Sequence, residues 1–249
     1  MTTVSSWSIL KQTNTNENVY INIFIFIRNG GETDLETENF FLTPPKAVGS
    51  ITQEEYDKLI KPYLEALNIV QIRLNSLNAE YRSRSNEYPI HNIQQRIKSK
   101  DSIIKKLQEK RLLVSVEAAR DELIDIAGIR VICYFENDIY SVVEAIRKQT
   151  GILMIRERDY VKKPKKKGYK SYHIVLGVPV YTLEETQYYP VEVQIRTISM
   201  DFWASMEHRI CYKNGCSEEA PEEIKEIMKG YADELKKIEV SMYEQSMKV

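Results

Sequence analysis

Residues 191–196 read VEVQIR, and this hexapeptide decides much of the fold and of the site. Successive side chains of a strand point to opposite faces, so the three apolar residues share one face. Glu192, Gln194 and Arg196 share the other face, where a carboxylate, an amide and a guanidinium stand in a row. The stretch predicts a strand whose polar face either binds a nucleotide and a metal ion or is solvated, and the strand alone leaves both interpretations open.

A second strand is predicted at 126–135, directly after Asp125. A carboxylate at the mouth of a mostly apolar strand is well placed to hold a hard cation, although a simple turn residue is the alternative. Asp125 and Arg130 have opposite parity in a regular strand. A bulge at Gly128, or a position of Asp125 just outside the strand, is needed if both are to face one site.

A strongly basic run follows at 156–170. Such runs are usually solvated loops, but Pro164 and Gly168 shape this one into a turn, and Tyr169 and His173 follow at once. Cations beside an aromatic ring suit a phosphate-bearing base that can stack on the ring. The basic residues are Arg156, Arg158, Lys162, Lys163, Lys165, Lys166, Lys167 and Lys170.

Helices are predicted on either side of these strands. Apolar residues recur every three or four positions over 52–81, which is typical of a helix. A second helix is expected over 93–113, with Lys98, Ser102 and Lys106 on one polar face and Arg96 beside it. The remaining pattern predicts strands at 152–160, 172–182 and 189–198 and helices at 137–149, 199–212 and 220–246. This order indicates an α+β fold, with a mixed β-sheet of about five strands flanked by helices.

The first fifty residues have a different character. Two β-prone runs, 19–27 and 37–43, are separated by Asn29-Gly30-Gly31 and predict an added N-terminal β-hairpin. We therefore expect an accessory β-hairpin and linker over 1–50, a catalytic domain over 51–216 and a C-terminal helix over 217–249. The apolar edge of the hairpin favours a role in oligomerisation or regulation.

Composition narrows the class of protein. The 249 residues carry a formal net charge of −1, so a site for a polyanion must be a local patch. Three cysteines without a CxxC pair argue against a disulfide or zinc framework and for a reducing compartment. A Walker A loop, a GxGxxG fingerprint and HExxH are absent from the sequence. No run is long enough to span a membrane, so we expect a cytoplasmic protein.

Taken together, these stretches resemble the small alarmone synthetases, the short relatives of the bacterial stringent-response enzymes of the RelA/SpoT type. The resemblance covers about residues 56–213. It rests on six motifs in the family's order: RIKSKDSIIKK (96–106), DIAGIRVIC (125–133), RERDY (156–160), GYKSYH (168–173), VEVQIRT (191–197) and MDFWASMEH (200–208).

The resemblance implies a nucleotidyltransferase-like synthetase fold and a magnesium-dependent transfer of the ATP β,γ-pyrophosphate to the ribose 3′-hydroxyl of GTP or GDP, with release of AMP. Asp125 and Glu192 would coordinate Mg²⁺, and Glu192 would also accept the proton of the attacking hydroxyl. Tyr169 would stack on the guanine. The ATP-binding residues implied are Arg96, Lys98, Ser102, Lys106 and Arg130. The acceptor-binding residues implied are Arg156, Arg158, Lys165, Tyr169, Lys170, His173, Gln194 and Arg196.

Two departures from the family pattern leave the acceptor open. Lys167 stands where relatives commonly have Asn, and Arg158 replaces the more usual Lys. Toxic relatives modify the 3′ CCA end of tRNA, and the lysine-rich loop makes tRNA the alternative acceptor. A catalytically dead nucleotide-binding or RNA-binding protein is a third hypothesis. For partners, the resemblance implies a homo-oligomer, with the 217–249 helix as one candidate surface, or an antitoxin.

Overall fold

The computed structural model describes residues 49–85, 88–213 and 222–248. This part of the chain contains a five-stranded sheet. Its strands are β1 (Ile90–Ile97), β2 (Ala127–Cys133), β3 (Leu153–Asp159), β4 (Tyr172–Tyr181) and β5 (Thr186–Thr197). They lie in the order β1-β2-β5-β4-β3, with β2 and β5 parallel and the other neighbours antiparallel, so the predicted mixed sheet is confirmed.

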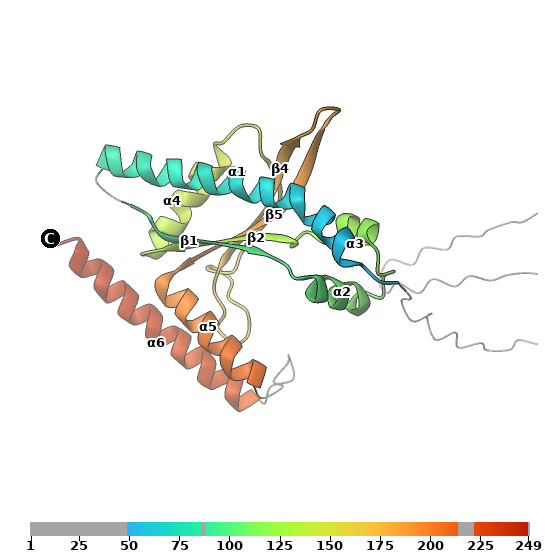
Figure 1. Cartoon of the computed structure of the whole chain (residues 1–249). Helices are drawn as coiled ribbons and strands as arrows, with labels where there is room; N and C mark the ends of the chain where they lie inside the picture. Colours follow the sequence, from blue (N-terminus) through green and yellow to red (C-terminus); the bar gives the residue numbers. More distant parts are fainter. Residues whose placement is uncertain (1–48, 86–87, 214–221, 249) are drawn as a thin grey trace, which may run out of the picture. The chain divides into compact units, whose positions relative to one another are not determined.

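Helices cover both faces of this sheet. Those of the described residues are α1 (Gln53–Ser85), α2 (Lys100–Glu109), α3 (Val116–Glu122), α4 (Glu136–Arg147), α5 (Ile198–Lys213) and α6 (Glu222–Ser246). Figure 1 shows α1 and α4 on one side of the sheet and α5 with α6 on the other. α1 contacts β1, β2, β4 and β5, and α5 packs between the sheet and α6. The predicted α+β architecture is therefore present.

The main core lies between α1, α4 and the apolar face of the sheet. Tyr63, Leu67 and Leu74 of α1 are at most 1% exposed, as are Ile129 of β2 and Ile195 of β5. Strand alternation sends the apolar residues of β2 and β5 to this side, which leaves their polar residues on the opposite face. The sheet thus presents a continuous polar face toward the side that carries α5.

The expected helix over 93–113 is wrong at its start. Residues 90–97 form the edge strand β1, and the helix begins only at Lys100, with Ser99 as its N-cap. A bulge shifts the β1–β2 register between Ile90 and Asn92. Ile93 and Ile97 are four residues apart, a separation that fits one face of a helix and also one face of a strand, and the bulge brings Ile90 to the same face.

The other predicted strands and helices are present, with shifts of a few residues at their ends. α3, which has only seven residues and follows the N-cap Ser115, was not predicted because it is too short to show a periodic stripe. The predicted N-terminal hairpin lies outside the described residues. No helix among residues 49–85, 88–213 and 222–248 is long and apolar enough to cross a membrane.

Candidate active site

The polar face of the sheet carries two rows of side chains that cross all five strands. Residues paired between neighbouring strands point to the same face, so each row is set by the register. The first row is Arg96, Gly128, Glu192, Val175 and Arg156, and the second is Gln94, Arg130, Gln194, His173 and Arg158. The register therefore gathers on one face residues that five separate motifs predicted.

A pocket of about 390 Å³ opens on this face, and both predicted metal-binding carboxylates line it. Asp125 lies just outside β2, one of the two arrangements needed for it to share a site with Arg130. Gly128 forms the floor between Arg96 and Arg130, where the absence of a side chain leaves room. The lining residues are Gln94, Gln95, Arg96, Lys98, Asp125, Gly128, Ile129, Arg130, Glu192 and Gln194.

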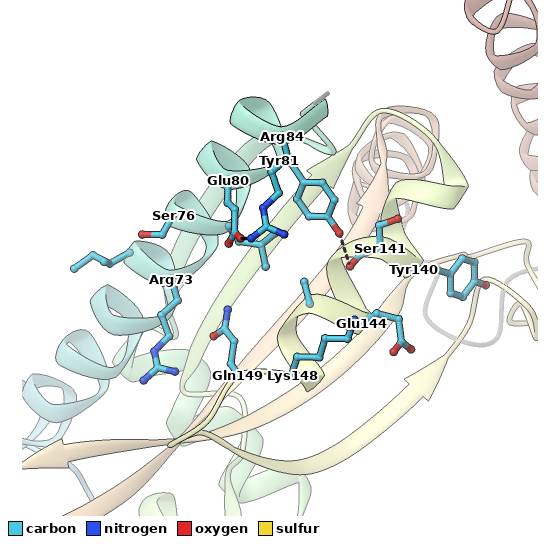
Figure 2. Close-up of a pocket in the computed structure, with 13 residues that line it drawn as sticks. Arg73, Ser76, Glu80, Tyr81, Arg84, Tyr140, Ser141, Glu144, Lys148 and Gln149 are labelled. Atoms are coloured by element: carbon cyan, nitrogen blue, oxygen red, sulfur yellow. Dashed lines mark hydrogen bonds and ion pairs between the residues drawn. The ribbon is translucent and has the colours of Figure 1, made fainter. Parts of the chain in front are cut away.

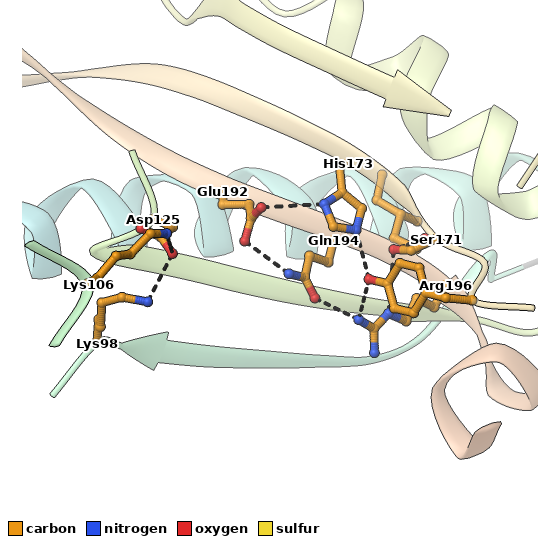
Figure 3. A network of polar contacts seen from close by, with 10 residues as sticks. Lys98, Lys106, Asp125, Ser171, His173, Glu192, Gln194 and Arg196 are labelled. Atoms are coloured by element: carbon orange, nitrogen blue, oxygen red, sulfur yellow. Dashed lines mark hydrogen bonds and ion pairs between the residues drawn. The ribbon is translucent and has the colours of Figure 1, made fainter. Parts of the chain in front are cut away.

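Asp125 is held by two lysines from opposite ends of the 96–106 motif. Its Oδ2 accepts from Lys98 Nζ at 2.9 Å and from Lys106 Nζ at 2.5 Å (Figure 3). Burial raises the pKa of Asp125, but the hydrogen bonds of Lys106 and Lys98 outweigh it and hold the pKa below its usual value. The other oxygen, Oδ1, is buried and has no hydrogen-bond partner among the described residues.

Glu192 belongs to a closed ring of five polar side chains, most of which Figure 3 labels. Gln194 Nε2 donates to Glu192 Oε2 at 2.9 Å, and Arg196 Nη2 donates to Gln194 Oε1 at 2.9 Å. The same Arg196 nitrogen donates to the Tyr169 hydroxyl at 2.7 Å. Tyr169 contacts His173 Nε2 at 2.8 Å, and His173 Nδ1 lies 3.4 Å from Glu192 Oε1, which closes the ring.

One arrangement of protons satisfies every member of this ring. A neutral His173 with its proton on Nδ1 donates to Glu192 and accepts from the Tyr169 hydroxyl. Two chains of hydrogen bonds then run from the Arg196 cation to the Glu192 anion. Burial raises the pKa of Glu192, but the hydrogen bonds from His173 and Gln194 lower it further than burial raises it, so Glu192 is held as a carboxylate.

Arg196 is itself anchored from the far side. It is 5% exposed, and its Nε donates to Ser171 Oγ while its Nη1 donates to Asp201 Oδ1 at 3.1 Å. The same Asp201 oxygen lies 3.2 Å from Nη1 of Arg130. Burial first, and then the neighbouring Arg196 charge, lower the pKa of Arg130. A single carboxylate oxygen thus joins the two guanidiniums.

The loop before β4 places Tyr169 beside this ring. Gly168 has a φ of +92°, and a Cβ there would lie 2.9 Å from the Cβ of Ala232 on α6, so glycine is required by both conformation and space. Tyr169 packs edge-on against Trp203 of α5, and Lys165 Nζ lies 5.3 Å from the Tyr169 ring centre. The structure therefore brings Tyr169 and Lys165 together as predicted, while their contact with an acceptor stays a prediction.

The remaining predicted residues lie at varying distances from the pocket lining. Arg156 and Arg158 are exposed on the edge strand β3, on the same face. The Ser102 side chain contacts Ser99 at the start of α2. Lys170 lines a different, small cavity beneath α6, together with Lys236 and the acidic residues Glu136 and Glu239.

Several residues of the site had no predicted role, and three of them matter most for its geometry. Gly128 was considered only as a bulge, Gln94 was assigned to a helix, and Asp201 was quoted within MDFWASMEH without a role. A usable signal existed for Asp201, since it is the first carboxylate after Arg196 and lies in the first turn of the following helix. Its contact with Arg130 depends on pairing between distant strands and has no local signal.

The residues present fit a magnesium ion. Mg²⁺ usually takes one or two carboxylates together with substrate phosphates and water, and Asp125 and Glu192 are two carboxylates on one pocket. Asp125 Oδ1 is a buried acceptor left without a partner among the described residues, as a ligand atom would be. Among these residues no group of three or more His, Cys, Asp or Glu side chains is placed to hold a metal without substrate.

A larger cavity lies elsewhere, between α1 and α4. It measures about 840 Å³ and is lined by residues such as Arg73, Glu80, Tyr140 and Lys148, as Figure 2 shows. None of its lining residues belongs to the six motifs, and its acidic residues are close to basic partners, as in the Glu80–Arg84 pair. Size alone therefore does not identify the active site.

Two carboxylates, several cations and an aromatic ring on one sheet face are typical of enzymes that move phosphate groups between nucleotides. Comparison with known proteins narrows this class. Residues 95–217 match the family model described as a region found in RelA / SpoT proteins. The chain is 35% identical over 175 residues to the GTP pyrophosphokinase YwaC of Bacillus subtilis, covering 70% of this chain and 83% of YwaC. It is 32% identical over 173 residues to YjbM of the same organism, covering 69% and 79%.

Solved structures agree with these relatives. The small alarmone synthetase 1 of Bacillus subtilis, bound to its product pppGpp, superimposes with a TM-score of 0.70 at 28% identity, covering 79% of this chain and 98% of that one. The small alarmone synthetase 2 of the same organism gives 0.68 at 32% identity, covering 78% and 99%. The chain belongs to the small alarmone synthetases of the RelA/SpoT family.

Proposed function

We propose that this chain is a GTP pyrophosphokinase, which transfers the β,γ-pyrophosphate of ATP to the ribose 3′-hydroxyl of GTP or GDP and releases AMP. The observation that carries the proposal is the pocket in which Asp125 and Glu192 meet Arg96, Lys98 and Arg130. The names of its Bacillus relatives, both GTP pyrophosphokinases, support the same reaction. Pyrophosphoryl transfer needs charge neutralisation and in-line positioning more than covalent chemistry, and this pocket offers the charges for it.

The donor side of the pocket fits ATP. Arg96 pairs with Gly128 across the strands, and Arg130 follows Gly128 by two residues on the same face of β2, so a flat base could lie between the two guanidiniums over a floor without a side chain. Lys98 and Lys106 would hold the phosphates, and Asp125 already keeps both ammonium groups together. When bound, Mg²⁺ would neutralise phosphate charge, with Asp125 and Glu192 as its protein ligands.

The acceptor side fits a nucleotide whose base stacks on Tyr169. The aromatic ring of Tyr169 is oriented by contacts of its hydroxyl with Arg196 and His173. His173 also contacts Glu192 directly, and Arg196 is connected to Glu192 through Gln194. Glu192 is held as a carboxylate, so it can accept the proton of the attacking 3′-hydroxyl. Base stacking and proton removal are thereby fixed within one hydrogen-bonded ring.

The relatives favour GTP or GDP over tRNA as the acceptor, because both Bacillus proteins are named GTP pyrophosphokinases. Lys162 and Lys165 lie over the rings of Tyr140 and Tyr160 at 4.8 and 5.0 Å. Lys167 pairs with Glu207 at 3.5 Å, and Lys170 lies near Asp233 and Glu239 of α6 and also near Lys236. Four other lysines of the loop, Lys162, Lys163, Lys165 and Lys166, are exposed, so the charge of the loop does not by itself separate a nucleotide acceptor from tRNA.

The acceptor is tested by incubating the full chain with ATP labelled in its γ-phosphate and Mg²⁺, with GTP, GDP or deacylated tRNA. We expect label on GTP and GDP and none on tRNA. Glu192→Gln protein serves as the control for contaminating activity. Label on tRNA alone would replace the proposal with the toxin hypothesis, and absence of label on every acceptor would favour the dead-relative hypothesis.

Gly128→Val tests the donor pocket. A Cβ at this position would meet only Arg96 O and Glu192 O, both at 3.8 Å, so a Cβ fits the strand without a clash, and the larger valine side chain is chosen to fill the floor. We expect the KM for ATP to rise about tenfold or more, with a smaller rise for Gly128→Ala and an unchanged melting temperature.

Gly230→Ala is the matched control for this substitution, because its Cβ would meet nothing within 4 Å on α6. Steady-state kinetics with ATP varied at saturating GDP measures the effect. An unchanged KM for ATP in Gly128→Val would show that the base does not bind over this floor.

A further inference from the structure

Asp201 occupies a position between the two halves of the site. It lies in the first turn of α5, and its side chain is 19% exposed. Its Oδ1 forms an ion pair with Arg130 Nη1 at 3.2 Å and accepts a hydrogen bond from Arg196 Nη1 at 3.1 Å. The two arginines come from the neighbouring parallel strands β2 and β5, so one carboxylate oxygen holds two like charges that would otherwise repel each other.

The two arginines belong to the proposed sites of different substrates. Arg130 lines the pocket assigned to ATP, and its Nε is buried without a partner among the described residues. The ion pair with Asp201 and a weak 3.5 Å hydrogen bond to Gln94 therefore orient its guanidinium. A flat guanidinium that stacks on a base must keep its plane, and Asp201 fixes one corner of that plane.

Arg196 belongs to the acceptor side and uses four of its five N–H groups in hydrogen bonds within the protein. Its three nitrogens donate to Ser171, Asp201, Gln194 and the Tyr169 hydroxyl, and its guanidinium carbon lies 5.1 Å from the centre of the Tyr169 ring. A guanidinium bound in this way has little donor capacity left for a phosphate. Its contacts indicate that it orients Tyr169 and, through Gln194, Glu192.

We propose that Asp201 is a positioning residue that sets the ATP-side Arg130 and the acceptor-side Arg196 at once, and that Arg196 acts through Tyr169 and Gln194 and not as a phosphate ligand. The proposal rests on the nucleotide sites described under the proposed function. It assigns to one carboxylate, which itself touches neither substrate, the relative placement of donor and acceptor. Transfer depends on that placement, because a reacting oxygen displaced by about 1 Å loses about a hundredfold in rate.

The test compares three variants of the full chain in the presence of Mg²⁺. Arg130→Lys is expected to weaken binding of a non-hydrolysable ATP analogue, and Arg196→Lys to weaken binding of GDP. Asp201→Asn keeps the size of the side chain but removes its charge, and it is expected to raise both dissociation constants about tenfold. Calorimetric titration with each nucleotide gives the constants, and product formation is measured in parallel.

Glu157→Gln is the matched control. Glu157 is a half-buried carboxylate that binds Arg147 at 2.7 Å and the Tyr172 hydroxyl at 2.7 Å, on the opposite face of the sheet. This variant also loses an ion pair, so its melting temperature is expected to fall about as much as that of Asp201→Asn, while its affinities for both nucleotides stay unchanged. That result would show that the weaker nucleotide binding of Asp201→Asn comes from lost positioning and not from lost stability. Should Asp201→Asn fold poorly, Asp201→Glu retains the charge but displaces the carboxylate by one methylene, and both constants are expected to rise less.

The outcomes are distinct. The proposal is supported if Asp201→Asn raises the dissociation constants of both the ATP analogue and GDP, while each arginine variant raises only one of them. Unchanged constants, or a change for one nucleotide alone, overturn it. Wild-type protein that binds both nucleotides but forms no product contradicts the proposed function and leaves the binding comparison valid.

Discussion

Glu192→Gln is expected to lower kcat about a thousandfold, the largest effect of any single substitution in the site. The change keeps the size of the side chain but removes a negative charge from the pocket and the proposed base. It also breaks the hydrogen-bonded ring, because His173 and Gln194 both donate to Glu192. A glutamine at this position would place its NH₂ group, a donor, opposite one of these two donors. Single-turnover product formation from ATP and GDP measures the effect.

The accompanying changes distinguish chemistry from misfolding. GDP binding should weaken less than kcat falls, because Tyr169 remains held by Arg196. Glu157→Gln, on the opposite face of the sheet, should retain wild-type turnover. Glu192→Gln protein with turnover within about tenfold of wild type would show that Glu192 is neither a base nor a metal ligand.

Asp125→Asn is expected to lower kcat by about a hundredfold or more, since it removes one of the two carboxylates placed to hold Mg²⁺. Raising the Mg²⁺ concentration should restore part of the lost activity in this variant and none in Gly128→Val, whose defect concerns the base of ATP. Activity measured over a series of Mg²⁺ concentrations tests this. Identical Mg²⁺ dependence in wild type and Asp125→Asn would contradict the assignment.

The same substitution should change how stability depends on pH. The lysines hold the pKa of Asp125 below its ordinary value of 3.8, so the ionised carboxylate stabilises the fold at pH values above that value. This contribution disappears as the pH falls through the lowered pKa. Asp125→Asn protein should therefore melt at a lower temperature than wild type at pH 7, and the difference should shrink toward pH 3. A difference that does not change with pH would show that the Lys98 and Lys106 contacts do not stabilise the ionised form.

Comparison of the predicted and observed folds shows where local pattern suffices. The strand at 189–198 was predicted because alternation in VEVQIR is complete, and α1 was predicted because its apolar stripe continues over many turns. β1 was predicted as a helix because the four-residue separation of Ile93 and Ile97 fits a helical face as well as one face of a strand. Lys98 was therefore assigned to a helical face, yet it still meets Lys106, through Asp125 and not along a helix.

The C-terminal helix illustrates a further limit. The pattern of 220–246 predicted its existence, but nothing local shows that Glu239 contacts Thr197 and Ser199, or that Gly168 packs against Ala232. α6 also exposes apolar side chains such as Ile238 and Met242. The expectation of a homo-oligomer through this helix stays a prediction.

The sequence by itself determined the kinds of chemistry available: carboxylates after and within two strands, cations on one motif, an aromatic ring in a basic turn, and which side of each strand is polar. These are properties of short stretches, because alternation and turn chemistry act over a few residues. Only the tertiary structure decided that Asp125 lies between two lysines, that five side chains close a ring around Glu192, and that Asp201 joins Arg130 to Arg196. Those contacts depend on strand order and register, which are set by packing between residues far apart in the chain.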